Sequence, residues 1–495
     1  MIKKIKENLS IDTKELLNKV KLNLKKMTKT EKLVKKQYKT HNPIKTNYKS
    51  KQKPQYRPHH SPKYSPKQDY IKELINKYYD NDKVVKEYLN TAHKKVHIYP
   101  KQQRIIVFGD IHGDLEAALD CFVLAGCINK ISIPKDKSVN NMNMFFKNLK
   151  WTGKDTYVVQ LGDQIDRVRP QTWDHNDITR DNAYKDEGST LEILYLFYYL
   201  NELAKKHEGR VFSIIGNHEI MNIEADFRYV SLKEFKCFKQ HLTQTYHKHS
   251  KYPYNSNTLK NNRHKLDNTN TNTNTNTNTN TNTNTNNNNN NSRDKFKNVP
   301  EGFRERLYAF SPTGLCSNII GTNNYVILQI GNWLFCHGSP VLNTIKKYNT
   351  DLINSVVSMY LLGMDTSDKY IEKHYNAIAN SKHDESILWN RDFGELDMTH
   401  NKNKELTTQL DNILHEYNKK NNSINTNNEA THIAIGHTIQ YTSNKGINSI
   451  CDERVWRCDV GMSRAFGQRS NEPHRKPQVL EIINMDGNEK ISVLV

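Results

Sequence analysis

Short apolar runs, several of which end at a glycine followed by polar side chains, recur along this chain of 495 residues. The run Ile105–Phe108 predicts a buried strand, and the spacing of apolar residues over 115–125 predicts a helix after it. Strands are then expected at 156–161 and 211–215, with a helix at 191–204 between them. This alternation favours an α/β domain whose polar residues lie on loops at strand ends.

The later part of the chain predicts a strand-rich end. Gly331-Asn332 separates two apolar runs and indicates a hairpin. The polar stretch around 140–143 is expected to be a loop. The further expected strands are 325–330, 333–336, 431–435, 454–460, 479–483 and 491–495, and the further expected helices are 352–362 and 406–417.

Two long segments lack any core-forming pattern. Residues 1–67 combine Lys runs with scattered Pro and predict a disordered basic arm. Helical spacing begins at 71–92, so the ordered domain is expected to span 68–495. An Asn/Thr tract within about 247–300 predicts a low-complexity loop inserted into that domain, because such a repeat builds no packed core.

Composition changes this picture only slightly. The formal net charge is +20, but residues 1–70 hold 20 Lys or Arg against 5 Asp or Glu, which leaves +5 for the rest of the chain. The arm therefore either serves solubility or binds an anionic partner such as nucleic acid or an anionic surface. Seven Cys without a CxxC pair predict reduced thiols. With no expected membrane span or signal peptide, the default location is intracellular and cytoplasmic.

Candidate chemistry lies in five stretches that each follow an apolar run. They are GDIHGD (109–114), GDQIDR (162–167), GNHE (216–219), CHGSP (336–340) and GHT (436–438). Asp, Asn and His side chains that meet at strand ends, without a Cys pattern, favour a hard or borderline divalent metal such as Mn²⁺, Fe or Zn²⁺.

The order and spacing of these motifs resemble the phosphoprotein phosphatase branch of the calcineurin-like metallophosphoesterases. The extended stretches GNHEIMNIEADFRYV and GHTIQYTSNKGINSICDERVWRCDVGMSRAFG resemble the Shewanella-like protein phosphatases in particular. The resemblance covers about 100–245 and 300–485. It implies a four-layer αββα sandwich that holds two divalent metal ions, with Mn²⁺ favoured and Fe or Zn²⁺ as alternatives.

The resemblance also implies roles for individual residues. Asp110, His112 and Asp163 would hold one metal ion, and Asp163, Asn217, His337 and His437 would hold the other, so that Asp163 bridges the two.

Four more residues are candidates for the chemistry itself. His218 resembles the acid that protonates the leaving group, with Asp166 orienting it. Arg167 resembles a phosphate-binding Arg at the rim of the site, and Arg391 in LWNRDF is a second candidate for that role.

Three functions follow as hypotheses. The first is a metal-dependent phosphoprotein phosphatase that hydrolyses phospho-Ser/Thr or phospho-Tyr monoesters with a metal-activated water. The second is a phosphoesterase of the same superfamily that acts on nucleotides or other small molecules. The third is a catalytically degenerate binding protein recruited by its basic arm.

Overall fold

The computed structural model describes twelve stretches of the chain, all within the compact unit formed by residues 61–495. They are residues 96–136, 138–169, 185–248, 299–312, 314–363, 369–379, 386–395, 399–421, 429–440, 445–467, 475–485 and 488–495. The expected basic arm, the expected helix at 71–92 and the Asn/Thr tract lie outside these stretches. Among the described helices, none has the length and apolar character needed to cross a membrane.

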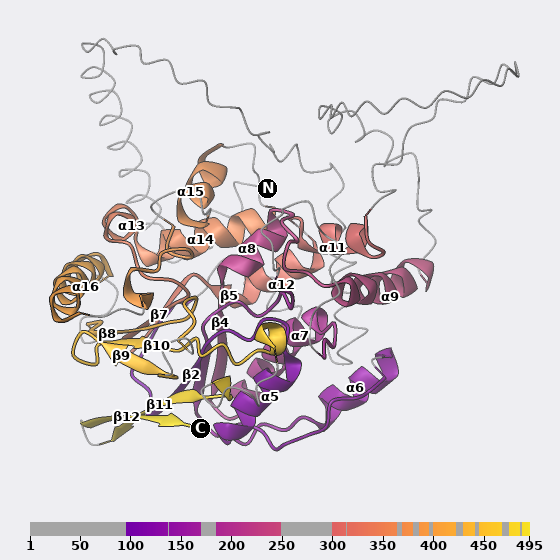
Figure 1. Cartoon of the computed structure of the whole chain (residues 1–495), viewed down its shortest axis with the longest axis horizontal. Coiled ribbons are helices and arrows are strands. Elements are labelled where there is room, and N and C mark those ends of the chain that lie inside the picture. The colour runs from indigo at the N-terminus through magenta and orange to yellow at the C-terminus, as the bar shows by residue number, and fades with distance from the viewer. Residues whose placement is uncertain are drawn as a thin grey trace, which may run out of the picture. The chain divides into compact units, whose positions relative to one another are not determined.

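Two six-stranded mixed sheets form the centre of the fold (Figure 1). One sheet has the order β12-β11-β2-β3-β4-β5, and the other has the order β1-β6-β7-β8-β10-β9. The strands are β1 (Ile98–Tyr99), β2 (Arg104–Phe108), β3 (Tyr157–Gln160), β4 (Arg210–Ile214), β5 (Asn324–Tyr325), β6 (Ile327–Ile330), β7 (Trp333–Cys336), β8 (His432–Ile435), β9 (Asn448–Ile450), β10 (Val455–Arg457), β11 (Val479–Met485) and β12 (Asn488–Leu494).

Parallel neighbours in each sheet explain where the site forms. In the first sheet β2, β3 and β4 run parallel, and in the second β7, β8 and β10 do. The strands β2 and β3 are fully or largely buried apolar runs, as expected for parallel strands covered on both faces. The carboxyl ends of parallel neighbours lie at the same edge of a sheet, so the loops after these strands are brought together.

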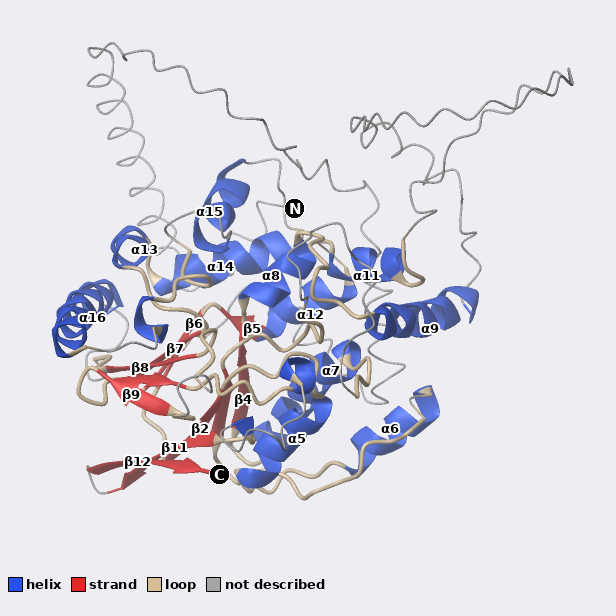
Figure 2. Cartoon of the chain, viewed as in Figure 1, coloured by secondary structure: helices blue, strands red, loops and turns tan. Residues whose placement is uncertain are grey.

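Helices cover the outer faces of both sheets, which gives the four layers αββα (Figure 2). On the first sheet Phe108 of β2 packs against Phe122 of α5 and Phe197 of α7, with ring centroids 5.5 and 6.2 Å apart. On the second sheet Asn354 of α14 accepts a hydrogen bond from the Val326 amide just before β6. The sandwich fold expected from the sequence is therefore present.

The helices follow a similar chain order. They are α5 (Leu115–Leu124), α6 (Val139–Asn148), α7 (Thr190–Lys205), α8 (Asn217–Ile223), α9 (Leu232–Lys248), α11 (Phe303–Phe310), α12 (Leu315–Asn323), α13 (Leu342–Lys347), α14 (Thr350–Leu361), α15 (Lys369–Ala379) and α16 (His400–Asn421), with short 3₁₀ turns at Asp392–Gly394 and Arg464–Phe466.

The segment around 140–143 corrects one expectation. The sequence predicts a loop there, but residues 139–148 form the helix α6. Met142, Phe145 and Phe146 are buried on one face of this helix, and their i, i+3, i+4 spacing provides the stabilising contacts that the run of Asn residues obscures.

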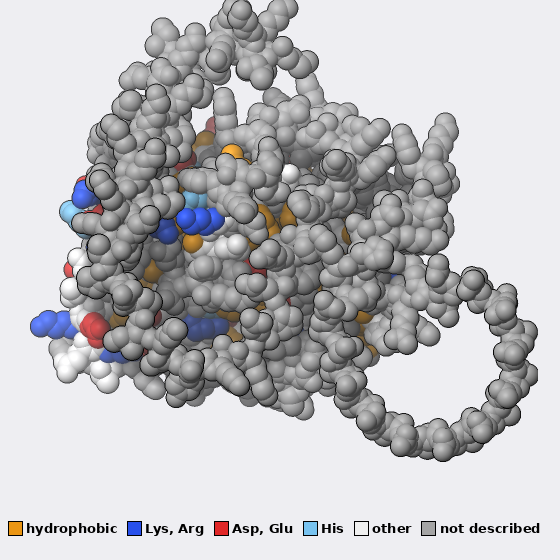
Figure 3. Space-filling view, turned by 90° about the horizontal axis from the view of Figure 1, so that it is seen from above, with side chains coloured by type: hydrophobic (Ala, Val, Ile, Leu, Met, Phe, Trp, Pro, Cys, Tyr) orange, Lys and Arg blue, Asp and Glu red, His pale blue; other side chains and the backbone are white. Residues whose placement is uncertain are grey.

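The described part of the surface carries both signs of charge. In the space-filling view of Figure 3, the coloured Lys and Arg side chains are interspersed with acidic and uncharged ones. This view therefore offers no support for a single-sign patch on the described part of that face.

Candidate metal centre

The predicted ligand residues lie on loops that leave the strands at one edge of the two sheets. Three of these ligands and one other site residue have backbone conformations in the left-handed region. The φ angles are 39° at His112, 51° at Asp163 and 68° at His437, and 74° at Asp166. Such conformations are unfavourable for non-glycine residues and are found preferentially at functional sites. Here all four lie in loops that carry the predicted site residues.

Hydrogen bonds between loops fix this arrangement. The His112 amide donates to the Asp163 carbonyl at 2.9 Å, and the Gly436 amide donates to the His337 carbonyl at 2.9 Å. Gly216 lies so close to Asp163 that an added Cβ would overlap the carboxylate. A glycine is therefore required before Asn217.

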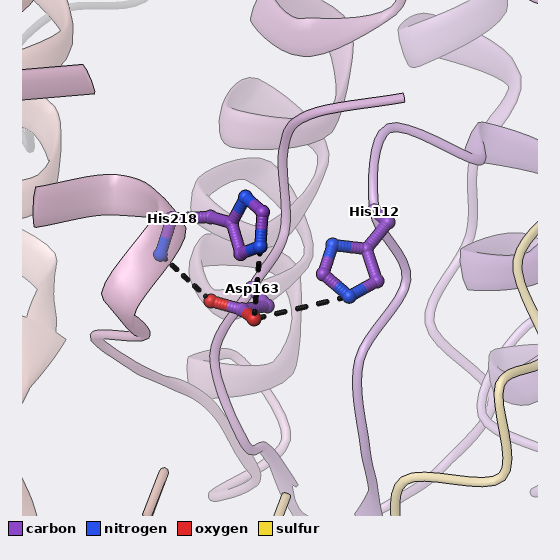
Figure 4. Close-up of side chains that lie close together, drawn as sticks. All are labelled: His112, Asp163 and His218. Carbon is purple, nitrogen blue, oxygen red and sulfur yellow. Dashed lines mark hydrogen bonds and ion pairs between the residues drawn. The ribbon is translucent and has the colours of Figure 1, made fainter. Parts of the chain in front are cut away.

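Asp163 lies between His112 and His218, as Figure 4 shows. Its Oδ2 is 3.8 Å from His112 Nε2 and 3.8 Å from His218 Nε2. The Oδ1 atom accepts a hydrogen bond from the His218 amide at 2.9 Å. His112, Asp163 and His218 together form one cluster able to hold a metal ion.

The same aspartate belongs to a second cluster with His337 and His437. Asp163 Oδ1 is 3.3 Å from His337 Nε2, and the His337 and His437 rings lie 4.8 Å apart. Asn217 contributes its Oδ1 at 2.9 Å from His337 Nε2. Asp163 is thus shared by both clusters, in the position that a bridging ligand would need.

Asp110 joins the two groups from the end of β2. Its Oδ2 is 3.8 Å from His112 Nε2, and both of its carboxylate oxygens accept the His437 amide at 3.2 Å. The six predicted ligands therefore lie together and are all buried.

Backbone carbonyls orient the ligand histidines. His337 Nδ1 is 2.7 Å from the Leu161 carbonyl oxygen, and His112 Nδ1 is 3.4 Å from the Ile165 carbonyl oxygen, so in both rings Nε2 is left for a metal ion. His437 instead places Nε2 3.1 Å from the Trp389 carbonyl oxygen, which leaves Nδ1. A carbonyl partner that takes the N–H of one nitrogen is the usual way to fix the tautomer of a ligand histidine.

The electrostatics of the cluster favour a neutral ring at His112 and His437, whereas at His337 burial is outweighed by Asp163, which raises the pKa of His337 above its ordinary value. Burial, together with Arg169 and His218, lowers the pKa of His112 well below its ordinary value. Burial and the neighbouring His337 do the same to the pKa of His437. A neutral imidazole keeps the lone pair that metal binding needs.

The carboxylates, in contrast, are crowded. Burial and the neighbouring Asp459 and Asp163 raise the pKa of Asp110 well above its ordinary value. Burial opposes ionisation of Asp163 too, but His337, His218 and His112 outweigh it and hold the pKa of Asp163 well below its usual range. Burial also raises the pKa of Glu219 to about 7, with Asp163 adding to the effect.

The environment of Asp459, which follows β10, indicates whether divalent cations fit this cluster. Its side chain is 1% exposed, and its Oδ2 has no hydrogen-bond partner among the described residues. Burial and nearby Asp163 raise its pKa to about 6. Its Cα lies 2.8 Å from where Gly109 would carry a Cβ, so it adjoins the Asp110 loop. An unpartnered buried carboxylate beside two others is an arrangement that bound divalent cations would stabilise.

His218 is held differently from the ligand histidines. Its Nδ1 is 2.8 Å from Asp166 Oδ2, and its Nε2 faces the cluster. Asp166 is fully buried and also accepts hydrogen bonds from Asn222 Nδ2 at 2.8 and 3.0 Å. The structure therefore brings His218 and Asp166 together in the pairing expected from the sequence.

Arg167, which the resemblance places at the rim of the site, faces two carboxylates in the structure. Its side chain is fully buried, and its Nη1 lies 3.4 Å from Asp114 Oδ2 and 3.5 Å from Glu187 Oε2. Arg464 meets the same two carboxylates. Since these carboxylates attract the guanidinium, Arg167 connects loops beneath the site.

Arg169, two residues further along, was missed by sequence reasoning and lies next to the cluster. Its Cζ is 5.4 Å from the ring centroid of Tyr229 and 4.6 Å from that of Phe466. Tyr229 contacts the His218 ring at 4.6 Å, and Phe466 contacts the His112 ring at 5.5 Å. The guanidinium therefore lies between two aromatic rings that each border a site histidine.

Arg391, in contrast, lies at the surface where the sequence suggests. Its side chain is exposed, and its Nη1 donates to the His437 carbonyl oxygen at 2.7 Å and to Thr438 Oγ1 at 3.2 Å. This places the guanidinium beside the loop that carries His437.

Other site residues were also missed. Glu219 accepts hydrogen bonds from the amides of Gly216, Asp163 and Gln164 at 2.7 to 3.0 Å. It belongs to GNHE, so the motif contained its signal. Asp459 lies in the CDVG stretch, and no pattern in the sequence distinguishes it from an ordinary aspartate that follows a strand.

The family comparison agrees with this geometry. Residues 103–309 match the family model described as calcineurin-like phosphoesterase. The match places a calcineurin-like phosphoesterase domain at residues 103–309, and together with the ligand clusters it supports a metal-dependent phosphoester hydrolase.

Curated relatives narrow the similarity. The chain is 27% identical over 398 residues to Shewanella-like protein phosphatase 2 of Arabidopsis thaliana, covering 78% of this chain and 76% of that protein. It is 23% identical over 361 residues to Shewanella-like protein phosphatase 1 of Plasmodium berghei, covering 73% and 67%. Among solved structures, a cold-active protein tyrosine phosphatase aligns with a TM-score of 0.45 and 16% identity, over 81% of this chain and 82% of that one.

Proposed function

We propose that this protein is a phosphoprotein phosphatase that hydrolyses phosphate monoesters of Ser, Thr or Tyr side chains. The observation that carries the proposal is Asp163, which is shared by two ligand clusters with a carboxylate-held histidine beside them. Two curated relatives that align with about three quarters of the chain are named as protein phosphatases, which supports a phosphoprotein substrate.

The ligand assignment keeps the second cluster and, in the first, replaces His218 with Asp110, because Asp166 holds His218. Asp110, His112 and Asp163 would hold one divalent ion, and Asp163 with Asn217, His337 and His437 would hold the other; Mn²⁺ is our first choice, with Fe or Zn²⁺ as alternatives. Bound divalent ions supply an activated water at neutral pH and offset phosphate charge.

His218 supplies the proton for the leaving group. Its Nδ1 lies 2.8 Å from Asp166, so Nε2 is directed to the cluster, where the ester oxygen of a substrate would leave. An imidazole in this position donates a proton to the departing alkoxide or phenoxide, which contributes ~10²- to 10⁴-fold to rate.

Arg169 and Arg391 bind the substrate phosphate, and Arg167 does not. The donors of Arg169 that face away from the Asp166 and Val168 carbonyls have no partner among the described residues. Within the part of the chain that the structure describes, Arg391 likewise donates hydrogen bonds only through Nη1. Each planar guanidinium therefore retains donors that match phosphate oxygens.

A substrate panel with metal analysis tests this proposal. Purified protein should contain two divalent ions per chain and turn over peptides with phosphoserine, phosphothreonine or phosphotyrosine faster than nucleotides and dinucleoside polyphosphates. Faster turnover of nucleotides would overturn the proposal in favour of a small-molecule phosphoesterase. Bound metal without turnover of any phosphoester would indicate a binding protein.

A further inference from the structure

We propose that Arg306 is a positioning residue for the reaction, holding the Asp166 carboxylate and through it the His218 imidazole. The inference rests on the role proposed above for His218. Arg306 belongs to none of the five motifs and lies on α11, on the far side of the Asn/Thr tract from the two motifs it serves, GDQIDR and GNHE.

The contacts of Arg306 end on the group that orients His218. Its Nη2 donates to Asp166 Oδ1 at 3.2 Å, and its Nε donates to Asn222 Oδ1 at 2.8 Å. Asn222 in turn donates to Asp166 and to the His218 carbonyl oxygen at 3.0 Å. One guanidinium thus contacts both the Asp166 carboxylate and Asn222, which itself donates to that carboxylate.

Both oxygens of Asp166 are used, and they are used for different purposes. Oδ2 meets His218 Nδ1 at 2.8 Å, and Oδ1 accepts from Arg306 and Asn222. Without Arg306 the carboxylate would lose its charged donor on Oδ1 and would be held there by the Asn222 amide alone, which also donates to Oδ2. The imidazole that it holds would then lose its alignment with the leaving oxygen.

The surroundings make Arg306 dependent on Asp166. Its side chain is fully buried, and its Cζ lies 4.9 Å from the ring centroids of Phe238 and Phe310. A desolvated guanidinium requires an anion, and Asp166 at 3.2 Å is closer than Glu234 at 4.0 Å. The aromatic cage therefore holds the charge where it faces Asp166.

The two helices on either side of the undescribed residues 249–298 build this support. α9 supplies Phe238 and Glu234, and α11 supplies Arg306. They pack through Phe235 and Phe303, with ring centroids 5.6 Å apart, and Lys239 of α9 forms an ion pair at 2.6 Å with Glu301, which lies just before α11. The inserted segment therefore connects two elements whose contact reaches the catalytic histidine.

The test uses the full-length metal-loaded protein with Arg306→Met and Arg306→Lys. The lysine variant keeps a positive charge in the cage but lacks the planar fork whose Nη2 and Nε contact Asp166 and Asn222, so it guards against loss of folding. Arg104→Met is the matched control, because Arg104 also forms a partly buried ion pair, with Glu481 at 2.7 Å, at the opposite end of β2. Turnover is measured on p-nitrophenyl phosphate and on phenyl phosphate, whose leaving group is more basic.

Both Arg306 variants should retain two metal ions and lose at least about tenfold more rate on phenyl phosphate than on p-nitrophenyl phosphate. Arg104→Met should lower the Tm and leave that ratio unchanged. In Asp166→Asn the ratio should already be shifted, and adding Arg306→Met should change it by less than about twofold.

Two results would overturn the inference. A shifted ratio in Asp166→Asn, with no shift in either Arg306 variant, would remove Arg306 from this role while leaving the proposed function intact. An unshifted ratio in His218→Ala would remove the proposed acid, and the role of Arg306 with it.

Discussion

The histidines of the site fall into two groups that are held in different ways. His112, His337 and His437 each direct one nitrogen to a backbone carbonyl oxygen, at 3.4, 2.7 and 3.1 Å. His218 instead directs Nδ1 to the buried carboxylate of Asp166 at 2.8 Å. A neutral carbonyl fixes a tautomer, whereas a carboxylate also stabilises the protonated ring.

This difference separates ligands from acid within one cluster. His218 and His112 both lie 3.8 Å from Asp163 Oδ2, so distance to the shared aspartate does not distinguish their roles. The partner on the other ring nitrogen does. Changes to the carbonyl-held group should therefore alter metal content, and changes to the carboxylate-held group should alter chemistry with metal content preserved.

The largest effect is expected at the residue that both groups share. Asp163→Asn should lower turnover by more than about 10³-fold and release metal ions, since an amide carries no charge to bridge two cations. Metal content and turnover are measured together, with circular dichroism as the folding check. Asp155→Asn, an exposed carboxylate before the same strand, is the control. Two retained ions with normal turnover would contradict the bridging role.

A smaller effect on turnover is expected at Arg169, next to the cluster. Arg169→Ala should lower kcat/KM by about 10- to 100-fold with unchanged Tm, because one charge-assisted pair of hydrogen bonds to phosphate is lost. The matched change Arg167→Met should mainly lower the Tm, since it leaves the buried carboxylates Asp114 and Glu187 short of one cation. If Arg167→Met and not Arg169→Ala raised KM, the assignment would be reversed.

Replacing Asp459 should change the stability of the metal-free protein. Its pKa is raised to about 6, so above that pH the folded state bears a buried charge that the unfolded state solvates. Asp459→Asn should therefore stabilise the metal-free protein at pH 8 by about 1 to 3 kcal/mol, and the gain should vanish as pH falls through 6 toward 4. Denaturant unfolding at both pH values measures it.

In the metal-loaded protein Asp459→Asn should lower the stability instead of raising it, because the lost carboxylate no longer attracts the cations. Weaker metal retention by Asp459→Asn during dialysis against a chelator would agree with this account. An Asp459→Asn protein that is less stable than wild type in its metal-free form at pH 8 would contradict the crowding of carboxylates.

The smallest effect is expected outside the site. Deleting 1–67, or 255–292, should change kcat on p-nitrophenyl phosphate by less than about tenfold, roughly 1.4 kcal/mol of barrier. Both segments lack motif residues, and α9 and α11 remain on either side of the second deletion. A larger loss in a deletion that keeps its Tm would show that the segment contributes to the site.

Strand ends made most of the site predictable from sequence. GDIHGD, GDQIDR, GNHE, CHGSP and GHT each follow a buried strand or its immediate extension, so local pattern was enough to bring Asp163 and His337 together. The α/β alternation was predictable for the same reason, as the strands β2, β3 and β4 agree with the apolar runs within one or two residues, whereas the sandwich was implied by the family resemblance.

The remaining features depend on contacts between residues far apart in the sequence, which limited their prediction. Arg167 and Arg169 are two residues apart, and only the distant carboxylates Asp114 and Glu187 decide which of them is buried. Arg306 reaches Asp166 across 140 positions and carries no motif. Helix α6 was mistaken for a loop because its polar face dominates its composition.

The most direct measurement of the central claim is the leaving-group dependence of His218→Ala compared with His437→Ala. A serine alkoxide needs protonation far more than a nitrophenolate does. His218→Ala should therefore keep two metal ions and lose ~10²- to 10⁴-fold on phosphoserine peptide but much less on p-nitrophenyl phosphate. His437→Ala should lose metal and slow both substrates alike. Equal losses on both substrates in His218→Ala, with metal content unchanged, would contradict the account.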